Sequence, residues 1–188
     1  MVDRGSLENC YTRKGIRGSN PLASAINYFM NHHPKVKIKA IIFDWGRTLF
    51  DSETKLEYPE AEPVLQECKN RGYILTVASL VSPLANATLS ERTSQIESSP
   101  LRKFFTIALT TETDKDEILK QIVTQLQLPA DEIMIVDDRT IRGISYGNKH
   151  GHPTAWLKQG RFANELPNTD TGLPTFTIKS LSELLDIV

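Results

Sequence analysis

Short apolar runs alternate with amphipathic stretches along most of the chain. Runs rich in β-branched and aromatic residues, such as 40–43 and 132–136, predict strands buried on both faces of a parallel sheet. The amphipathic stretches predict helices, the clearest of which has apolar residues at 118, 119, 122, 123 and 126 on one face, typical of core packing. Strict alternation of strands and helices predicts an α/β fold, a three-layer doubly wound parallel sheet.

Residues that begin or end helices help to place the elements. Gly72 ends one predicted helix, and Thr113, with Asp116 three residues later, begins another. Strands are expected at 35–43, 73–78, 104–109, 132–136 and 154–157, with a short edge strand at 175–178. Helices are expected at 59–71, 83–96, 114–128, 140–150 and 180–187, and loops at 45–58 and 158–173.

Residues 1–34 lack this alternation. They are polar and show no helical or strand period, so we predict disorder there, with a short helix near 24–30. Residues 17–21 (RGSNP) look like a translated transfer-RNA gene, so the alternative is that the start is misassigned and that Met30 is the true start. The expected organisation is a leader over 1–34, disordered or misassigned, and one domain over 35–188.

Composition narrows the classes of function. A chain of 188 residues with 39% hydrophobic and 24% charged residues suits one globular domain. A net charge of -1 gives no basic field for nucleic acid, and no apolar run approaches the ~18 residues of a membrane span. Cys10 and Cys68 have no metal-binding or disulfide spacing, so a reduced, cytoplasmic protein is expected. Oligomerisation stays open.

Polar side chains follow three of the predicted strands. Asp44 ends the first, Ser79 the second, and the pair Asp137 and Asp138 the fourth, while Lys115 begins the helix before that fourth strand. Alone, each has a structural explanation as a turn residue, a helix cap or a surface lysine. Because carboxyl ends of parallel strands share the edge where ligands bind, their convergence predicts a functional site.

The residue types at this edge indicate phosphoryl chemistry. Carboxylates suit Mg²⁺, and lysine with a hydroxyl suits the oxygens of a phosphoryl group. A carboxylate can attack phosphorus and form an aspartyl-phosphate, and the metal would neutralise charge between the two anions. Lys115 lies in the first turn of the predicted helix, where a cation opposes the helix dipole. A functional role is therefore favoured for Lys115 over Lys120, which lies further along the same helix.

From residue 38 onward the sequence resembles the haloacid dehalogenase (HAD) superfamily of hydrolases. The resemblance rests on the motifs FDWGRTL at 43–49, Ser79 after its strand, Lys115, and VDDR at 136–139. It implies that Asp44 is the nucleophile and a ligand of Mg²⁺, and that Ser79 and Lys115 hold the phosphoryl group. It also implies that the Gly46 carbonyl and Asp138 bind the metal, with assistance from Asp137.

The sequence departs from the family pattern in two places. Phosphatases of this family usually carry a second Asp two residues after the nucleophile, which protonates the leaving group, but Gly46 stands there. The acidic residue expected near the start of the helix after Asp138 is replaced by Arg142 and Gly143. The short separations between Asp44, Ser79 and Lys115 leave no room for a cap domain, so an open site for a small or macromolecular phosphate, or a lid lent by a partner chain, is expected.

Three functions follow from this sequence. The first is a Mg²⁺-dependent HAD-like phosphatase acting through an aspartyl-phosphate on Asp44, attenuated because Gly46 replaces the acid/base residue. The alternative is a catalytically weak or inactive protein of this fold that binds a phosphorylated ligand or partner. A receiver domain is disfavoured, because there the acidic pair comes on the first strand and the phosphorylated Asp later.

Overall fold

The computed structural model describes residues 38–82 and 87–188. The predicted leader at 1–34, its short helix and the start of the first strand at 35–37 lie outside the described residues. The same holds for 83–86, the predicted start of the second helix. Among the residues that are described, no helix is long and apolar enough to cross a membrane.

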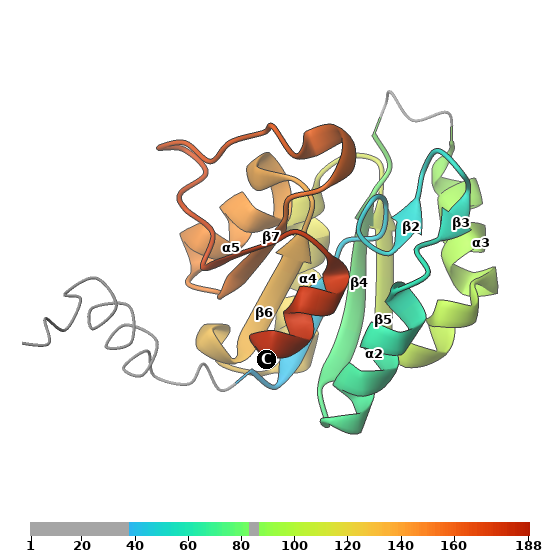
Figure 1. Ribbon diagram of the computed structural model, residues 1–188, viewed down its shortest axis with the longest axis horizontal. Coiled ribbons are helices and arrows are strands. Elements are labelled where there is room, and N and C mark those ends of the chain that lie inside the picture. The colour runs from blue at the N-terminus through green and yellow to red at the C-terminus, as the bar shows by residue number, and fades with distance from the viewer. Residues whose placement is uncertain (1–37, 83–86) are drawn as a thin grey trace, which may run out of the picture. The chain divides into compact units, whose positions relative to one another are not determined.

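A six-stranded parallel sheet forms the centre of the molecule, in the order β5-β4-β1-β6-β7-β8 (Figure 1). Its strands are β1 (Ala40–Phe43), β4 (Ile74–Leu80), β5 (Ile107–Thr111), β6 (Ile133–Asp137), β7 (Thr154–Leu157) and β8 (Phe176–Ile178). The register pairs Phe43 with Val77 on one side and with Val136 on the other. The polar residues that follow these three apolar positions are therefore brought to one edge of the sheet.

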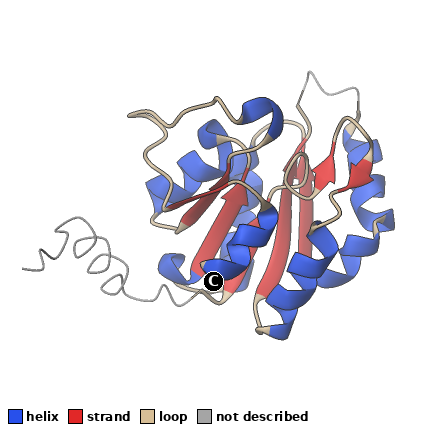
Figure 2. Ribbon diagram, in the orientation of Figure 1, coloured by secondary structure: helices blue, strands red, loops and turns tan. Residues whose placement is uncertain are grey.

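Helices cover both faces of this sheet (Figure 2). The α-helices are α2 (Ala61–Asn70), α3 (Leu89–Ser98), α4 (Lys115–Leu126) and α5 (Ser145–His150). Alternate residues of β1 enter two separate apolar clusters: Ile41 packs with Leu65 of α2, and Ile42 packs with Ile118 and Ile122 of α4. Burial of the α4 stripe confirms its predicted place in the core, and the three-layer doubly wound fold is confirmed.

Several predicted boundaries were wrong for local reasons. Residues 45–58, expected as a loop, contain a two-stranded antiparallel hairpin, β2 (Phe50–Asp51) and β3 (Leu56–Glu57). Helix α3 begins at Leu89 rather than Pro83, because Thr88 and Glu91 form a capping box. Asp114, not Thr113, caps α4 by accepting a hydrogen bond from the Asp116 amide.

Short helical turns account for further differences. The residue Phe104, expected in a strand, ends a 3₁₀ turn, and the helix expected at 140–150 is interrupted by the non-helical backbone of Arg142 inside the segment Thr140–Ile144, after which α5 follows. The closing helix expected at 180–187 is also 3₁₀. These turns are η1 (Pro100–Phe104), η2 (Ala130–Glu132), η3 (Thr140–Ile144), η4 (Gly160–Phe162) and η5 (Leu181–Asp186).

The connections across the sheet are short. Between β1 and β4 the chain forms only the hairpin β2–β3 and helix α2, and α3 with η1 are the described elements between β4 and β5. The described parts of these connections contain no further element, and the absence of a cap domain stays a prediction.

Candidate active site

Asp44 lies at the end of the central strand and is 6% exposed. Its amide donates a hydrogen bond to the Val136 carbonyl, which fixes the backbone next to β6. The chain then turns, and Thr48 places its hydroxyl 3.5 Å from Asp44 Oδ2. Within this turn Arg47 has a left-handed backbone (φ 67°), a conformation that is uncommon for residues other than glycine. The turn thus holds the Asp44 carboxylate at the strand edge.

Lys115 joins two of the predicted carboxylates. It is the first residue of α4, is 3% exposed, and pairs with Asp44 Oδ1 and with Asp137 Oδ2, the latter at 2.6 Å. Burial alone would lower the pKa of Lys115, but the charges of Asp137 and Asp44 outweigh it and raise that pKa. The lysine therefore stays protonated between its two partners.

The two adjacent aspartates are held differently. Asp137 accepts hydrogen bonds from the amides of Arg139 (2.8 Å) and Gly143 (3.0 Å) as well as from Lys115. Asp138 is 2% exposed, and its Oδ2 is a buried oxygen without a hydrogen-bond partner. A buried carboxylate oxygen without a partner is unfavourable unless a ligand meets it. Asp138 is thus the carboxylate that is free to bind a cation.

Together these carboxylates fit a divalent metal ion. Asp44, Asp137 and Asp138 each offer an oxygen, and these oxygens lie within 4.8 Å of one another. Burial raises the pKa of Asp44 more than the pairing with Lys115 lowers it. Burial, with the charges of Asp44 and Asp137, raises the pKa of Asp138 to about 8. An oxygen-only donor set with excess negative charge is the type that Mg²⁺ prefers.

The raised pKa of Asp138 predicts that the stability of the magnesium-free protein depends on pH. With a folded pKa of about 8 against an ordinary carboxyl pKa, the folded state keeps a proton that the unfolded state has lost. The free energy of unfolding is therefore highest near the ordinary carboxyl pKa and falls as the pH rises from there through about 8. We expect the midpoint of thermal unfolding in chelator to decrease between pH 5 and 9.

The matched controls are Asp138→Asn, which is expected to flatten this profile, and Asp170→Asn at an exposed carboxyl, which is expected to leave it unchanged. Magnesium competes with the same proton, so its affinity is expected to rise by up to about tenfold per pH unit below pH 8. Titration calorimetry measures that slope, and an affinity that is flat between pH 6 and 8 contradicts the assignment of Asp138.

Ser79 lies at the same edge, near the end of β4, and is 1% exposed. Its hydroxyl accepts a hydrogen bond from Arg92 Nη1 at 3.3 Å. Arg92 comes from α3 and lines, with Asp44, Gly46 and Asp138, a cavity of about 200 Å³. Ser79 is therefore connected to the cavity wall by its hydrogen bond with Arg92.

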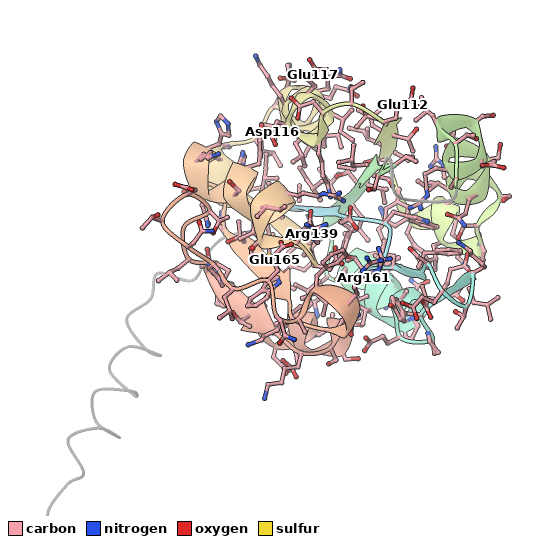
Figure 3. The ribbon with its side chains drawn as sticks, turned by 90° about the horizontal axis from the view of Figure 1, so that it is seen from above. Glu112, Asp116, Glu117, Arg139, Arg161 and Glu165 are labelled. Carbon is pink, nitrogen blue, oxygen red and sulfur yellow. The ribbon has the colours of Figure 1, made fainter. Side chains whose placement is uncertain are left out.

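A loop from the far end of the chain supports this edge. Glu165 accepts hydrogen bonds from Arg139 Nε (2.6 Å) and from the Thr140 hydroxyl (3.1 Å), directly after the aspartate pair. The Arg139 guanidinium also lies 3.8 Å from the centre of the Phe162 ring. Figure 3, a view from above, shows Arg139 and Glu165 close together near the middle of the molecule, with Arg161 beside them. These contacts fix the loop that carries Asp138.

The structure thus places all the predicted site residues at one edge. Asp44, Lys115 and Asp137 are in direct contact, Asp138 is next to them, and Gly46 lines the cavity. Sequence reasoning missed Arg92, Thr48 and Glu165. Thr48, inside the FDWGRTL motif, could have been singled out, whereas Arg92 and Glu165 have no local signal because tertiary packing brings them to the site.

Residues 8–157, most of the chain, match the family described as haloacid dehalogenase-like hydrolase. The chain belongs to this family. No curated protein matches the sequence at a significant level. The predicted membership of the HAD superfamily is confirmed.

Solved structures of HAD proteins share the fold. A predicted phosphoglycolate phosphatase from Haemophilus somnus 129PT superposes with a TM-score of 0.64 at 14% identity, covering 80% of this chain and 98% of that one. A predicted phosphatase from Clostridium acetobutylicum gives 0.62 at 15% identity, covering 79% and 97%. YfnB of Bacillus subtilis, described as a HAD-hydrolase bound to magnesium, gives 0.61 at 14% identity, covering 80% and 98%. At these identities the likeness establishes the shared HAD fold.

Proposed function

We propose that the protein is a magnesium-dependent phosphatase of the HAD family that uses Asp44 as its nucleophile. The observation that carries the proposal is the buried Asp44 carboxylate, paired with Lys115 and close to the unpartnered oxygen of Asp138, in the wall of a cavity. The names of the Haemophilus and Clostridium structures and the magnesium in YfnB support the same reaction class and cofactor. The substrate is a phosphorylated molecule, small or macromolecular, and the expected location is cytoplasmic.

Each residue has a defined part in this reaction. An Asp44 oxygen attacks phosphorus and forms an aspartyl-phosphate as the bond from phosphorus to the leaving oxygen breaks, and water then hydrolyses the aspartyl-phosphate. Lys115 and the Ser79 hydroxyl bind the phosphoryl oxygens. Asp44, Asp138 and the Gly46 carbonyl would hold Mg²⁺, with Asp137 assisting, and the ion would supply charge neutralisation between nucleophile and substrate. Asp137 also orients Lys115 through their 2.6 Å ion pair.

Turnover is proposed to be attenuated because no side chain at position 46 can donate or accept a proton. General acid–base catalysis typically contributes ~10²–10⁴-fold. A second candidate function, binding of a phosphorylated ligand without turnover, is favoured by the same residue. In this case Asp44 and Asp138 would hold Mg²⁺, and Lys115 and Ser79 would bind the phosphate, but no product is released.

Trapping with beryllium fluoride and Mg²⁺ tests the nucleophile. We expect a fluoride adduct in the native protein, visible by ¹⁹F NMR, that disappears in Asp44→Asn. The matched control is Asp51→Asn in the same turn, whose carboxylate instead bonds the Glu53 amide and the Thr54 hydroxyl. Hydrolysis of p-nitrophenyl phosphate is expected to fall by more than ~10³-fold in Asp44→Asn.

The outcomes separate the two functions. An adduct with turnover supports the phosphatase, and an adduct without turnover supports the binding protein. An adduct that persists in Asp44→Asn, or that Asp51→Asn abolishes, overturns the assignment of Asp44 as nucleophile.

A further inference from the structure

Arg92 occupies the space that a longer side chain at position 46 would enter. A Cβ atom built on Gly46 would lie 3.2 Å from Arg92 Nη1 and 3.4 Å from the hydroxyl of Ser52. The family's usual acid/base carboxyl is absent at this position, and the guanidinium of Arg92 fills the space where it would lie. The cavity therefore contains a fixed cation where related phosphatases place a proton donor.

Arg92 is buried in an unusual manner. It is 8% exposed, its side chain bonds Ser79 Oγ, a neutral partner, and its Nε is a buried donor without a hydrogen-bond partner. Burial of a guanidinium without a carboxylate partner is unfavourable and is normally compensated by an anion. Burial lowers the pKa of Arg92, with the charge of Asp44 opposing this, and arginine stays protonated in proteins. The side chain is thus prepared to bind an anion from the cavity.

Most of the other charged side chains that line the cavity are positive, like Arg92. Arg47, Lys55 and Arg142 line it together with Arg92, and Asp44 and Asp138 are the acidic residues in the described lining. Those two carboxylates are the nucleophile and a magnesium ligand of the proposed function. The part of the cavity left for the remainder of the substrate is therefore cationic.

We propose, as a step that rests on the proposed function, that the site takes phosphoryl compounds whose leaving group departs as an anion, namely phosphoanhydrides and acyl phosphates. Arg92 binds the departing anionic oxygen, and Arg47, Lys55 and Arg142 bind the remaining charge of that group. Alkyl phosphates are poor substrates, because an alkoxide needs a proton that no residue at position 46 can supply. Glycine at position 46, where the family usually has Asp, then changes which leaving groups the enzyme accepts and does not only remove a catalytic group.

The atoms balance without a general acid. The Asp44 oxygen forms a bond to phosphorus as the bond from phosphorus to the leaving oxygen breaks, and that oxygen keeps the electron pair and departs as phosphate or carboxylate. Water then attacks phosphorus, the bond to Asp44 breaks, and the carboxylate is regenerated. The protons of the water remain on the dihydrogen phosphate that is released.

A leaving-group series tests the proposal with the full chain and Mg²⁺. We expect kcat/KM to decrease from acetyl phosphate through p-nitrophenyl phosphate and phenyl phosphate to glycerol 3-phosphate, by more than about 10³-fold over the series. Arg92→Gln is expected to lower kcat/KM for acetyl phosphate at least about tenfold, with partial recovery in Arg92→Lys. Arg102→Gln, the same change outside the cavity, is expected to have no effect.

A binding measurement gives a readout besides activity. In the native protein, calorimetry with Mg²⁺ is expected to show methylenediphosphonate binding at least about tenfold more tightly than methylphosphonate, which lacks the second anion, and Arg92→Gln is expected to remove this preference. If Arg92→Gln fails to fold, Lys55→Asn serves instead, because Lys55 is exposed and its left-handed backbone (φ 62°) suits asparagine. In Lys55→Asn we expect the preference for methylenediphosphonate over methylphosphonate to fall several-fold.

The outcomes distinguish the two levels of proposal. Equal turnover of acetyl phosphate and glycerol 3-phosphate, or a diphosphonate preference that survives both variants, overturns the leaving-group proposal and leaves the phosphatase intact. Absence of both the fluoride adduct and turnover of every compound in the series, acetyl phosphate included, overturns the proposed function itself.

Discussion

Lys115→Met is expected to lower the free energy of unfolding by about 3–5 kcal/mol, the typical effect of removing one partner of a buried ion pair. Lys115 is 3% exposed and is the cation that pairs with both Asp44 and Asp137. Methionine keeps the length and apolar stem of the side chain but leaves two buried carboxylates without their counterion. The loss therefore reports on charge and not on a cavity.

Urea unfolding at pH 7 in chelator measures this loss. The matched control is Lys120→Met, on the exposed surface of the same helix, for which a change within about 0.5 kcal/mol is expected. The double variant Lys115→Met/Asp137→Asn is expected to recover part of the stability, because one unpaired charge is removed with it. Saturating Mg²⁺ is expected to reduce the loss, since the ion meets the same carboxylates. A Lys115→Met protein as stable as native would show that the pairing contributes nothing.

The parts of the site that could be predicted from sequence are those set by local pattern. Asp44 and the pair Asp137 and Asp138 follow apolar runs directly, and parallel pairing carries their positions to one edge. Its position at a helix N-terminus distinguishes Lys115 from Lys120, because a cation there is unfavourable without a purpose. The structure gives that purpose, since the lysine is buried between two carboxylates.

The parts that could not be predicted depend on packing between distant segments. Arg92 lies on a helix whose other described residues are mostly polar and exposed, and nothing in its neighbours distinguishes it. Its burial results from the position of α3 against β5 and from the absence of a side chain at Gly46. Glu165 likewise reaches Arg139 from a loop that has no periodic pattern. By contrast, the start of α3 does have a local signal in the sequence, because Thr88 and Glu91 have the spacing of a capping box.

Gly46→Asp alone is expected to improve turnover of glycerol 3-phosphate by less than about tenfold, although it restores the residue that phosphatases of this family usually carry. A Cβ at this position would stand 3.2 Å from Arg92 Nη1, so the new carboxylate would pair with the guanidinium. An arginine beside a carboxylate lowers the pKa of that carboxyl and makes it a weak proton donor. The restored residue would therefore be held in its ionised form.

Gly46→Asp combined with Arg92→Gln is expected to raise kcat for glycerol 3-phosphate by ~10²–10⁴-fold over the native protein, the usual contribution of general acid–base catalysis. The same double variant is expected to lose activity toward acetyl phosphate, whose leaving group needs no proton but uses the charge of Arg92. Gly46→Asn/Arg92→Gln is the control of matched size without an ionisable group. Steady-state kinetics on the two substrates would show the exchange of specificity, and a full gain from Gly46→Asp alone would mean that Arg92 does not govern position 46.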